Sequence, residues 1–541
     1  MAKNMTNYNF FSRFESWLSS HVTLLAFFIV ISGFFVYLYY ASGYYLNPDE
    51  ASHFVFANQE TLLDAYLASH STSHPPLMIM ILHLFLGIGK SVFMLRLLSA
   101  LFCAAAAWLA FKWIKDTYGS VEAITGLVLL TFSPAMVSAA SEVRQYAMLL
   151  FFICGALYSM QRFLKEKSLR WGLVYTGFLY GAIVTHYSAI LITLTLAIYV
   201  TILLFRNNYG RRFNFFWVIS QAGVIVLYLL LYVTHIKWML NSGFARDQIQ
   251  GYLKSMYFFA GTETIISFVS RNTVDFFAYI TGVKLVGYLA MFCFLAGIVY
   301  IICKSINDTR YREKQYDSFL LIFPFIIAIP AALLKVMPFG GSRHSTYLLP
   351  FAITLIALCV VRVFSLKKVS FIIIAAVIML SMWLSNIHLP NADLDMSDTY
   401  MRDVLTKLNE KVPANSVLFV DDMTHYVLAY YLASDQSSLK CVRHETLCEK
   451  QMGKYRVVHA KPWAFSPSNF EHELFTLSRF YDFASEDGVW IMTVGWGDTS
   501  KMFNTFLSNY PLGRIRERWN FGPIILLQIA MPPKMGPFST I

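Results

Sequence analysis

Long apolar runs separated by short polar stretches dominate the first 390 residues or so of the chain. A helix needs about 20 apolar residues to cross the ~30 Å hydrocarbon core of a bilayer, and most of these runs are close to that length. The pattern therefore predicts about eleven membrane helices. They cover residues 22–43, 93–114, 121–140, 145–164, 171–187, 189–205, 214–237, 279–303, 318–337, 344–364 and 369–388.

The apolar run at residues 76–87 is too short for a span and fits a re-entrant or interfacial helix, which Pro75 and Pro76 would start well. If this run does not cross, the Lys- and Arg-rich loops all fall on the side of the N-terminus, as the positive-inside rule requires. We therefore expect a cytoplasmic N-terminus, with the loop 44–92 and the C-terminus outside. The long outer segment 238–278 suits a helix lying in the interface.

Residues 389–541 have a different pattern, in which short β-type runs alternate with amphipathic helical segments. This predicts a small α/β domain outside the membrane, after a membrane domain formed by residues 1–388. Cys441 and Cys448 lie close together in this part of the chain. In an oxidising compartment they could form a disulfide or remain free thiols.

Composition agrees with a multi-pass membrane protein, because 57% of the 541 residues are hydrophobic and only 14% are charged. These values exclude an ordinary soluble domain. The net charge of +11 would suggest a nucleic-acid partner in a soluble protein. Here the Lys and Arg residues cluster between apolar runs as topology signals, so we expect a lipid bilayer and no nucleic acid as partner.

Two adjacent carboxylates, Asp49 and Glu50, stand in the loop 44–92, which is the first outer loop of the predicted topology. Their plainer role would be to cap a helix expected at about 51–68, since Asp is a good N-cap. A carboxylate can also act as general base and take the proton of an attacking hydroxyl. The residues alone leave both roles open.

Other polar residues converge on the same predicted outer face. Two or three cations there could hold a phosphate, whereas a single Arg or Lys at a helix end would simply snorkel. Three histidines near two carboxylates could also bind a divalent cation, but they lack a recognised metal spacing, so no metal site and no cofactor is expected. The residues are Glu142, Arg144 and Tyr146, His74, His186 and Tyr187, and Lys335, Arg343 and His344.

Several motifs, in this order, resemble the GT-C membrane glycosyltransferases, above all the bacterial relatives of the dolichyl-phosphate-mannose protein mannosyltransferases and of the lipid A aminoarabinose transferase. The resemblance covers about residues 20–365. The motifs are NPDEASH (47–53), SHPPL (73–77) with MLRLLSALF (94–102), SPAMVSAASEVRQYAML (133–149), THYSA (185–189) and RHSTYLLPF (343–351).

The resemblance implies a polyprenyl-phosphate sugar donor and transfer on the outer face with inversion at the anomeric carbon. It makes Asp49 the base, with Glu50 beside it. Arg144 and Tyr146, preceded by Glu142, match the family's E-x-R-x-Y pattern. His74 stands where relatives carry His or Lys before paired prolines. Arg343-His344 replaces the usual Arg-Tyr, which makes the role of His344 less secure than that of Arg343.

We therefore predict a hexosyl- or pentosyltransferase of the inner (plasma) membrane with a periplasmic C-terminal domain. It would move a monosaccharide to an envelope lipid, glycan or protein. Arg144, Arg343, Lys335 and His74 are expected to bind the donor phosphate, and Glu142, Tyr146, His186, Tyr187 and His344 to line the substrate site. The alternative is a transporter or flippase of a lipid-linked sugar, but internal repeats and paired broken helices are not evident in the sequence.

Overall fold

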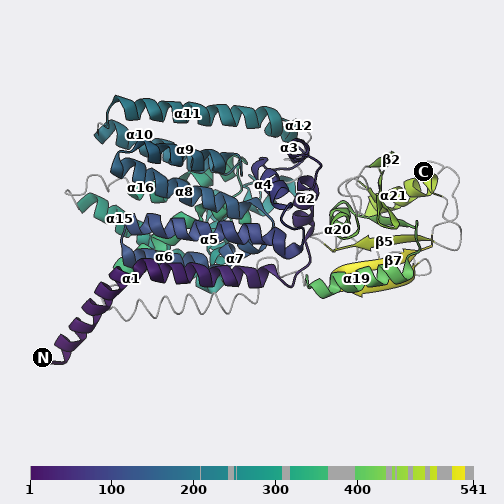
Figure 1. The fold of residues 1–541 in the computed structure, drawn as a ribbon, viewed down its shortest axis with the longest axis horizontal. Coiled ribbons are helices and arrows are strands. Elements are labelled where there is room, and N and C mark those ends of the chain that lie inside the picture. The colour runs from purple at the N-terminus through teal and green to yellow at the C-terminus, as the bar shows by residue number, and fades with distance from the viewer. Residues whose placement is uncertain are drawn as a thin grey trace. The chain divides into compact units, whose positions relative to one another are not determined.

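The computed structural model describes most of the chain and divides it into two compact units (Figure 1). We call residues 1–41, 66–81 and 93–391 the membrane unit, and residues 42–65, 82–92 and 392–541 the sheet unit. The predicted helix 369–388 lies outside the described residues. These are 2–207, 209–241, 249–251, 253–307, 317–363, 396–433, 441–444, 447–460, 467–481, 488–495 and 515–530.

The membrane unit is helical, and every predicted span within the described residues overlaps a helix or a bent helix pair. The helices that overlap the spans predicted at 171–187 and 318–337 have only 15 and 17 residues. By length and composition, seven helices of the described residues could cross a membrane, or up to eight if the bent pair is one span. The helices include α1 (Ala2–Ala41), α5 (Val92–Thr117), α6 (Ser120–Thr131), α7 (Pro134–Ser141), α8 (Gln145–Glu166), α9 (Leu169–Ile183), α10 (Ala189–Asn207), α11 (Arg211–Leu231), α14 (Ile265–Thr281), α15 (Lys284–Asn307), α16 (Asp317–Leu333) and α17 (Leu349–Leu358).

The bent pair is α6 and α7, where the sequence predicted one helix over 121–140. The two axes differ by 56°. Pro134 cannot donate a backbone hydrogen bond and disfavours helical geometry in the residue before it. Helix α7 begins after Ser133, which is its N-cap: the Ser133 hydroxyl accepts a hydrogen bond of 3.1 Å from the Met136 amide. The expectation of a continuous helix here is wrong, and the break places the end of α7 at Glu142.

Two further segments bear on the predicted topology. Helix α4 (Leu77–Phe85) has nine residues and is about 13 Å long, so it is too short to cross the bilayer, in agreement with the sequence. The sequence predicted a helix lying in the interface over 238–278. The described part of this segment does not form one continuous helix, because α12 (Lys237–Asn241) and the 3-10 turn η2 (Lys254–Met256) precede the separate helix α14, so the prediction of a single helix is wrong.

Of the candidate spans, Gln145–Glu166 and Arg343–Val363 are the most enclosed by the rest of the protein. The second span starts with a 3-10 turn, η5 (Arg343–Leu348), which leads into α17. Gly341 just before this turn lies against α14 so closely that an added Cβ would meet the Asp275 carbonyl at 2.3 Å. Arg144 directly precedes the first of these spans as its N-cap, and Arg343 is the first residue of the second.

The sheet unit contains a seven-stranded sheet, which confirms the predicted C-terminal α/β domain. The strand order is β2-β3-β4-β1-β5-β7-β6, with β4, β1 and β5 parallel and the other pairs antiparallel. A disulfide joins Cys441 to Cys448. The strands are β1 (Val417–Val420), β2 (Val442–His444), β3 (Leu447–Met452), β4 (Tyr455–Ala460), β5 (Val489–Thr493), β6 (Ile515–Phe521) and β7 (Ile524–Ile529), and the helices are α19 (Asp398–Lys411), α20 (Asp422–Leu432) and α21 (Pro467–Phe480).

The sheet unit also includes the start of the loop 44–92, which the sequence predicts to be the first outer loop. Where the sequence predicted one helix over 51–68, the structure has α2 (Pro48–Ala57) and α3 (Leu62–Ser69), so that prediction is wrong. Helix α2 packs against α20, with the Phe54 ring 4.9 Å from that of Tyr430. The Leu46 amide donates to the Tyr431 hydroxyl at 3.2 Å. The helix that bears Asp49 is thereby attached to the C-terminal domain.

Candidate active site

The acidic pair lies in the first turn of α2, and the structure separates the roles of its two members. Asn47 is the N-cap, and its side chain accepts from the Glu50 amide at 2.9 Å. The Glu50 carboxylate in turn accepts from the Asn47 amide at 3.1 Å, which completes a capping box. Glu50 is fully buried. Its carboxylate therefore has a structural role at the start of the helix.

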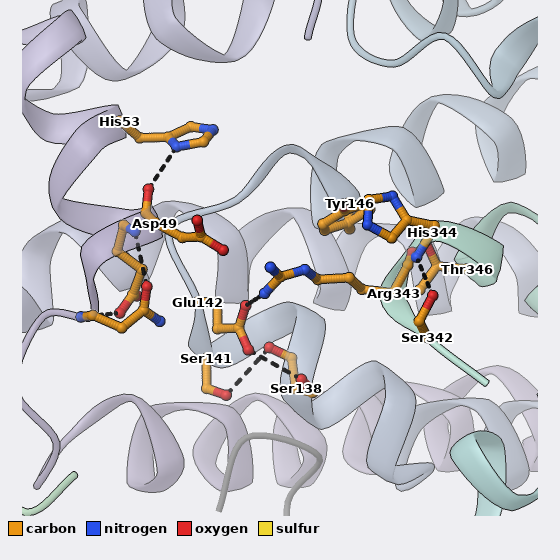
Figure 2. A network of polar contacts seen from close by, with 12 residues as sticks. Asp49, His53, Ser138, Ser141, Glu142, Tyr146, Ser342, Arg343, His344 and Thr346 are labelled. Atoms are coloured by element: carbon orange, nitrogen blue, oxygen red, sulfur yellow. Dashed lines mark hydrogen bonds and ion pairs between the residues drawn. The ribbon is translucent and has the colours of Figure 1, made fainter. Parts of the chain in front are cut away.

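Asp49 is the second residue of α2 and does not cap the helix. The capping role considered for Asp49 from the sequence is filled by Asn47 and Glu50. The side chain of Asp49 is half-buried. Its backbone carbonyl accepts from the Ser52 hydroxyl at 2.8 Å. It also accepts from Nδ1 of His53 at 2.8 Å (Figure 2). These bonds fix the backbone that carries the Asp49 carboxylate within the sheet unit.

A second group of polar residues lies in the membrane unit, around the turn between α7 and α8. Glu142 ends α7, and its carboxylate lies 3.4 Å from a guanidinium nitrogen of Arg343 (Figure 2). The Ser138 hydroxyl donates to the other carboxylate oxygen at 3.2 Å. Glu142 is buried and the Arg343 side chain is 19% exposed. The ion pair thus fixes the 3-10 turn η5 to the end of α7.

Arg144 stands two residues further on, as the N-cap of α8, and its side chain makes no capping hydrogen bond. It is 5% exposed, and its guanidinium carbon lies 5.8 Å from the ring of Tyr146. A helix N-terminus carries a partial positive charge and favours anions. Two arginines, one carboxylate and this helix end leave an excess of positive charge around the turn.

Tyr146 connects the arginines to the histidines of the membrane unit. Its hydroxyl lies 3.3 Å from Nδ1 of His344, within hydrogen-bond distance (Figure 2). Its ring lies 5.3 Å from that of His186, which stacks at 5.3 Å on the ring of His74. The structure therefore brings together residues that are far apart in the sequence and were predicted to share a site.

His186 lies in the turn between α9 and α10, outside both helices. Burial, and secondarily the charge of Arg144, lower the pKa of His186 to about 3. The Ser188 amide donates to Nδ1 at 3.1 Å, which assigns the ring proton to Nε2. His186 is thus a neutral imidazole that can offer an N–H donor.

Two predicted residues stand apart from these contacts. Lys335 is exposed, and its ammonium lies 4.0 Å from the centre of the Phe259 ring. The Tyr187 hydroxyl is buried and has no hydrogen-bond partner among the described residues. Sequence reasoning missed Ser138 and Asn47, although an Asn three residues before a Glu is a capping-box-like signal that could have been recognised.

The chain was compared with known proteins. Residues 73–238 match the family described as dolichyl-phosphate-mannose-protein mannosyltransferase. The search of curated proteins found no match. The structure of ArnT from Cupriavidus metallidurans in the apo state is similar, with a TM-score of 0.55 and 12% identity over 93% of this chain and 98% of that chain. The Archaeoglobus fulgidus oligosaccharyltransferase gives a TM-score of 0.45 and 10% identity over 77% of this chain and 63% of that chain.

At 12% identity the likeness to ArnT establishes the fold, which extends over both units of the chain. The family match supplies a sequence relationship for the part that contains His74, Arg144, Tyr146 and His186. Together the two findings confirm the resemblance drawn from the sequence motifs and support a membrane glycosyltransferase of the GT-C superfamily.

Proposed function

We propose that the protein is an inverting glycosyltransferase, which moves a monosaccharide from a polyprenyl-phosphate donor to a hydroxyl of an envelope lipid, glycan or protein on the outer face of the membrane. The observation that carries the proposal is the pair of arginines around the N-terminus of α8, in a chain with an ArnT-like fold. That arrangement provides what a lipid-linked phosphate requires at a membrane surface, namely fixed positive charge.

The donor phosphate is assigned to Arg144 and Arg343. Arginine offers a planar fork of donors that matches phosphate oxygens. Glu142 holds the Arg343 guanidinium in place and offsets one positive charge, so the group neutralises a phosphate without a large excess. Lys335 and His74 are also assigned to the donor phosphate, on the basis of the sequence. Tyr146, His186, Tyr187 and His344 supply hydroxyl, imidazole and ring surfaces suited to a sugar.

Asp49 is assigned as general base. In the proposed step it takes the proton of the acceptor hydroxyl while that oxygen forms a bond to the anomeric carbon of the donor sugar. The bond from the anomeric carbon to the phosphate oxygen breaks, and its electron pair leaves with the polyprenyl phosphate. A single displacement inverts the anomeric configuration. The support from the structure is that Asp49 is half-buried on a rigid helix turn and is not used as the cap.

The test is a transfer assay with purified protein in detergent and a set of polyprenyl-phosphate sugars carrying a labelled hexose or pentose. Each donor is incubated with an envelope fraction as acceptor source, and the anomeric configuration of the product is read by NMR. The proposal expects labelled product from at least one donor, with inverted configuration. Product of retained configuration would remove the single displacement, and no transfer from any such donor would remove the donor class.

One observation favours the alternative, which is a flippase of a lipid-linked sugar. The chain is bent between α6 and α7, and transporters use broken helices. Such helices usually come in corresponding pairs, and the described residues contain one bent pair. The transfer assay separates the two functions, since a flippase would move the donor across vesicles without forming a new glycosidic bond.

A further inference from the structure

The sheet unit contains a cluster of two histidines and a carboxylate that the proposed transfer reaction does not use. Asp422 is the first residue of α20, two residues after the end of β1, and His425 follows about one turn later. His459 stands near the end of β4, the strand that pairs with β1 in parallel. In parallel α/β sheets, ligands bind at the carboxyl ends of the strands, and this cluster lies at those ends.

The distances within the cluster fit a shared ion. One Asp422 carboxylate oxygen lies 3.6 Å from Nδ1 of His425 and 3.4 Å from Nδ1 of His459. The candidate ligand atoms of the three residues all lie within 4.8 Å of one another. With bonds of about 2.0–2.2 Å, ligand atoms around a tetrahedral zinc ion stand roughly 3.3–3.5 Å apart.

His459 gives an independent reason to expect a ligand. It is 8% exposed, and among the described residues neither of its ring nitrogens makes a hydrogen bond, although Nδ1 lies 3.4 Å from the Asp422 carboxylate oxygen. Buried polar atoms are almost always satisfied in native proteins, and a site for an ion is one of the recognised explanations for an exception. A neutral imidazole binds metals through the nitrogen lone pair, which an unpartnered ring nitrogen can present without first breaking a bond.

We propose that Asp422, His425 and His459 form a binding site for a divalent transition-metal ion of the Zn²⁺ class. Imidazole and carboxylate are the ligand types that such ions accept, and the three residues leave a fourth position for water. The site goes beyond the proposed transfer reaction, because its residues belong to the C-terminal domain and take no part in that chemistry.

The rings must move for the ion to bind. The imidazoles of His425 and His459 are stacked at 3.8 Å with their planes 2° apart, so one ion cannot lie in both ring planes. His425 is held by a bond of 2.6 Å from Nδ1 to the Asp422 carbonyl, and Lys450 lies 3.2 Å from its Nε2. Among the described residues no hydrogen bond holds the His459 ring, and we therefore expect this ring to turn about its contact with Asp422, while His425 exchanges its backbone bond for the ion.

Binding here would strengthen the attachment of the first outer loop to the C-terminal domain. The ion would connect the junction of β1 and α20 to β4, and α20 is the helix that packs against α2. The ring of Tyr426, next to His425, lies 5.8 Å from that of Phe56 of α2, with the two planes tilted. We expect metal binding to raise the thermal stability of the protein as any ligand of the folded state does.

The test uses the full-length protein without a histidine tag, stripped of metal in detergent and titrated with Zn²⁺ by calorimetry. Asp422→Asn and His459→Gln remove one ligand each. Lys450→Met removes a neighbour that is not a ligand, and His21→Gln removes an exposed histidine elsewhere. The proposal expects one bound Zn²⁺ per chain, with affinity lowered at least about ten-fold in the two ligand variants and kept in the two controls.

Three results would overturn the proposal. The unchanged protein could fail to bind one equivalent of Zn²⁺, or Asp422→Asn and His459→Gln could bind Zn²⁺ as tightly as the unchanged protein. The third is a loss of Zn²⁺ binding in Lys450→Met. Co²⁺ provides a readout that does not depend on whether the variants fold. A tetrahedral site with nitrogen and oxygen ligands gives Co²⁺ intense visible absorption, which excess Zn²⁺ should abolish. Absorption of only the hexaaquo ion would contradict the assigned site.

Discussion

The carboxylate of Glu142 lies 3.4 Å from the guanidinium of Arg343, although 201 residues separate the two along the chain. The pair connects the end of α7 to the turn that begins the span of α17. The Ser138 hydroxyl donates to the other oxygen of the same carboxylate. This arrangement makes Glu142 a positioning residue for Arg343.

Glu142→Gln should weaken the use of the donor, because a neutral amide no longer holds the guanidinium through an ion pair. We expect kcat/KM for the donor to fall about ten-fold, mostly through KM, since hydrogen bonds to charged groups contribute about 1.5–3 kcal/mol. Ser141→Ala is the matched control, because the Ser141 hydroxyl bonds only to backbone carbonyls of α7. Equal kinetics for the two variants would remove the positioning role.

Arg144→Lys keeps the positive charge and loses the planar fork of donors. If the guanidinium binds phosphate oxygens in pairs, the change should still lower kcat/KM by about ten-fold or more. Arg162→Lys on the same helix, whose partners are Asp116 and Glu166, controls for a general effect on α8. Full activity of the Arg144 variant would show that charge alone suffices there, or that this residue does not bind the donor.

The topology can be tested by labelling single cysteines with a reagent that does not cross membranes. Ser71→Cys lies between α3 and α4, and Ser168→Cys lies between α8 and α9. Cys303, which is exposed, is first replaced by Ala. We expect the two new thiols to react from opposite sides in sealed vesicles. Reaction from the same side would contradict the positive-inside argument and the outer placement of the first loop.

The capping box of α2 predicts an effect on stability rather than on chemistry. Asn47→Ala removes the side-chain acceptor for the Glu50 amide and should cost roughly 1 kcal/mol, whereas Asn47→Asp should be nearly neutral. Hydrogen exchange of the α2 amides measures the local change directly. Equal protection in the Ala and Asp variants would mean that the cap does not stabilise the helix.

Much of the helical fold could be predicted because a membrane span requires a long apolar run, and the runs stand out in this sequence. The break at Pro134 and the division between α2 and α3 were missed. Both depend on short polar or proline-containing stretches, Phe132–Pro134 and Asn58–Thr61, inside or beside otherwise helical patterns. Local signals of that kind compete with periodicity and often decide the boundaries of a helix.

The candidate site was only partly predictable. The sequence indicated Glu142, Tyr146, His186 and His344, and contacts in the membrane unit bring them together. The residues alone could not separate Asp49 from Glu50, because either carboxylate suits a helix start, and the assignment of the base to Asp49 came from the family resemblance. The partner of Lys335 could also be identified only from three-dimensional contacts, which place its ammonium over the ring of Phe259. A charge pattern along the chain does not reveal which partner a long side chain reaches.

In the proposed reaction Asp49, and not its neighbour Glu50, takes the proton of the acceptor hydroxyl. Asp49→Asn and Glu50→Gln each remove one negative charge from adjacent positions of α2. The Gln side chain can still accept from the Asn47 amide and complete the capping box, so the second variant preserves the helix start.

The measurement is the rate of labelled-sugar transfer from the polyprenyl-phosphate donor by the two purified variants at saturating donor, with donor binding measured alongside. Loss of a general base typically costs about 100- to 10,000-fold in rate. We expect a loss of that size for Asp49→Asn with donor binding kept, and a rate within a few-fold of the unchanged protein for Glu50→Gln. Near-normal transfer by Asp49→Asn would contradict the assignment of the base to Asp49.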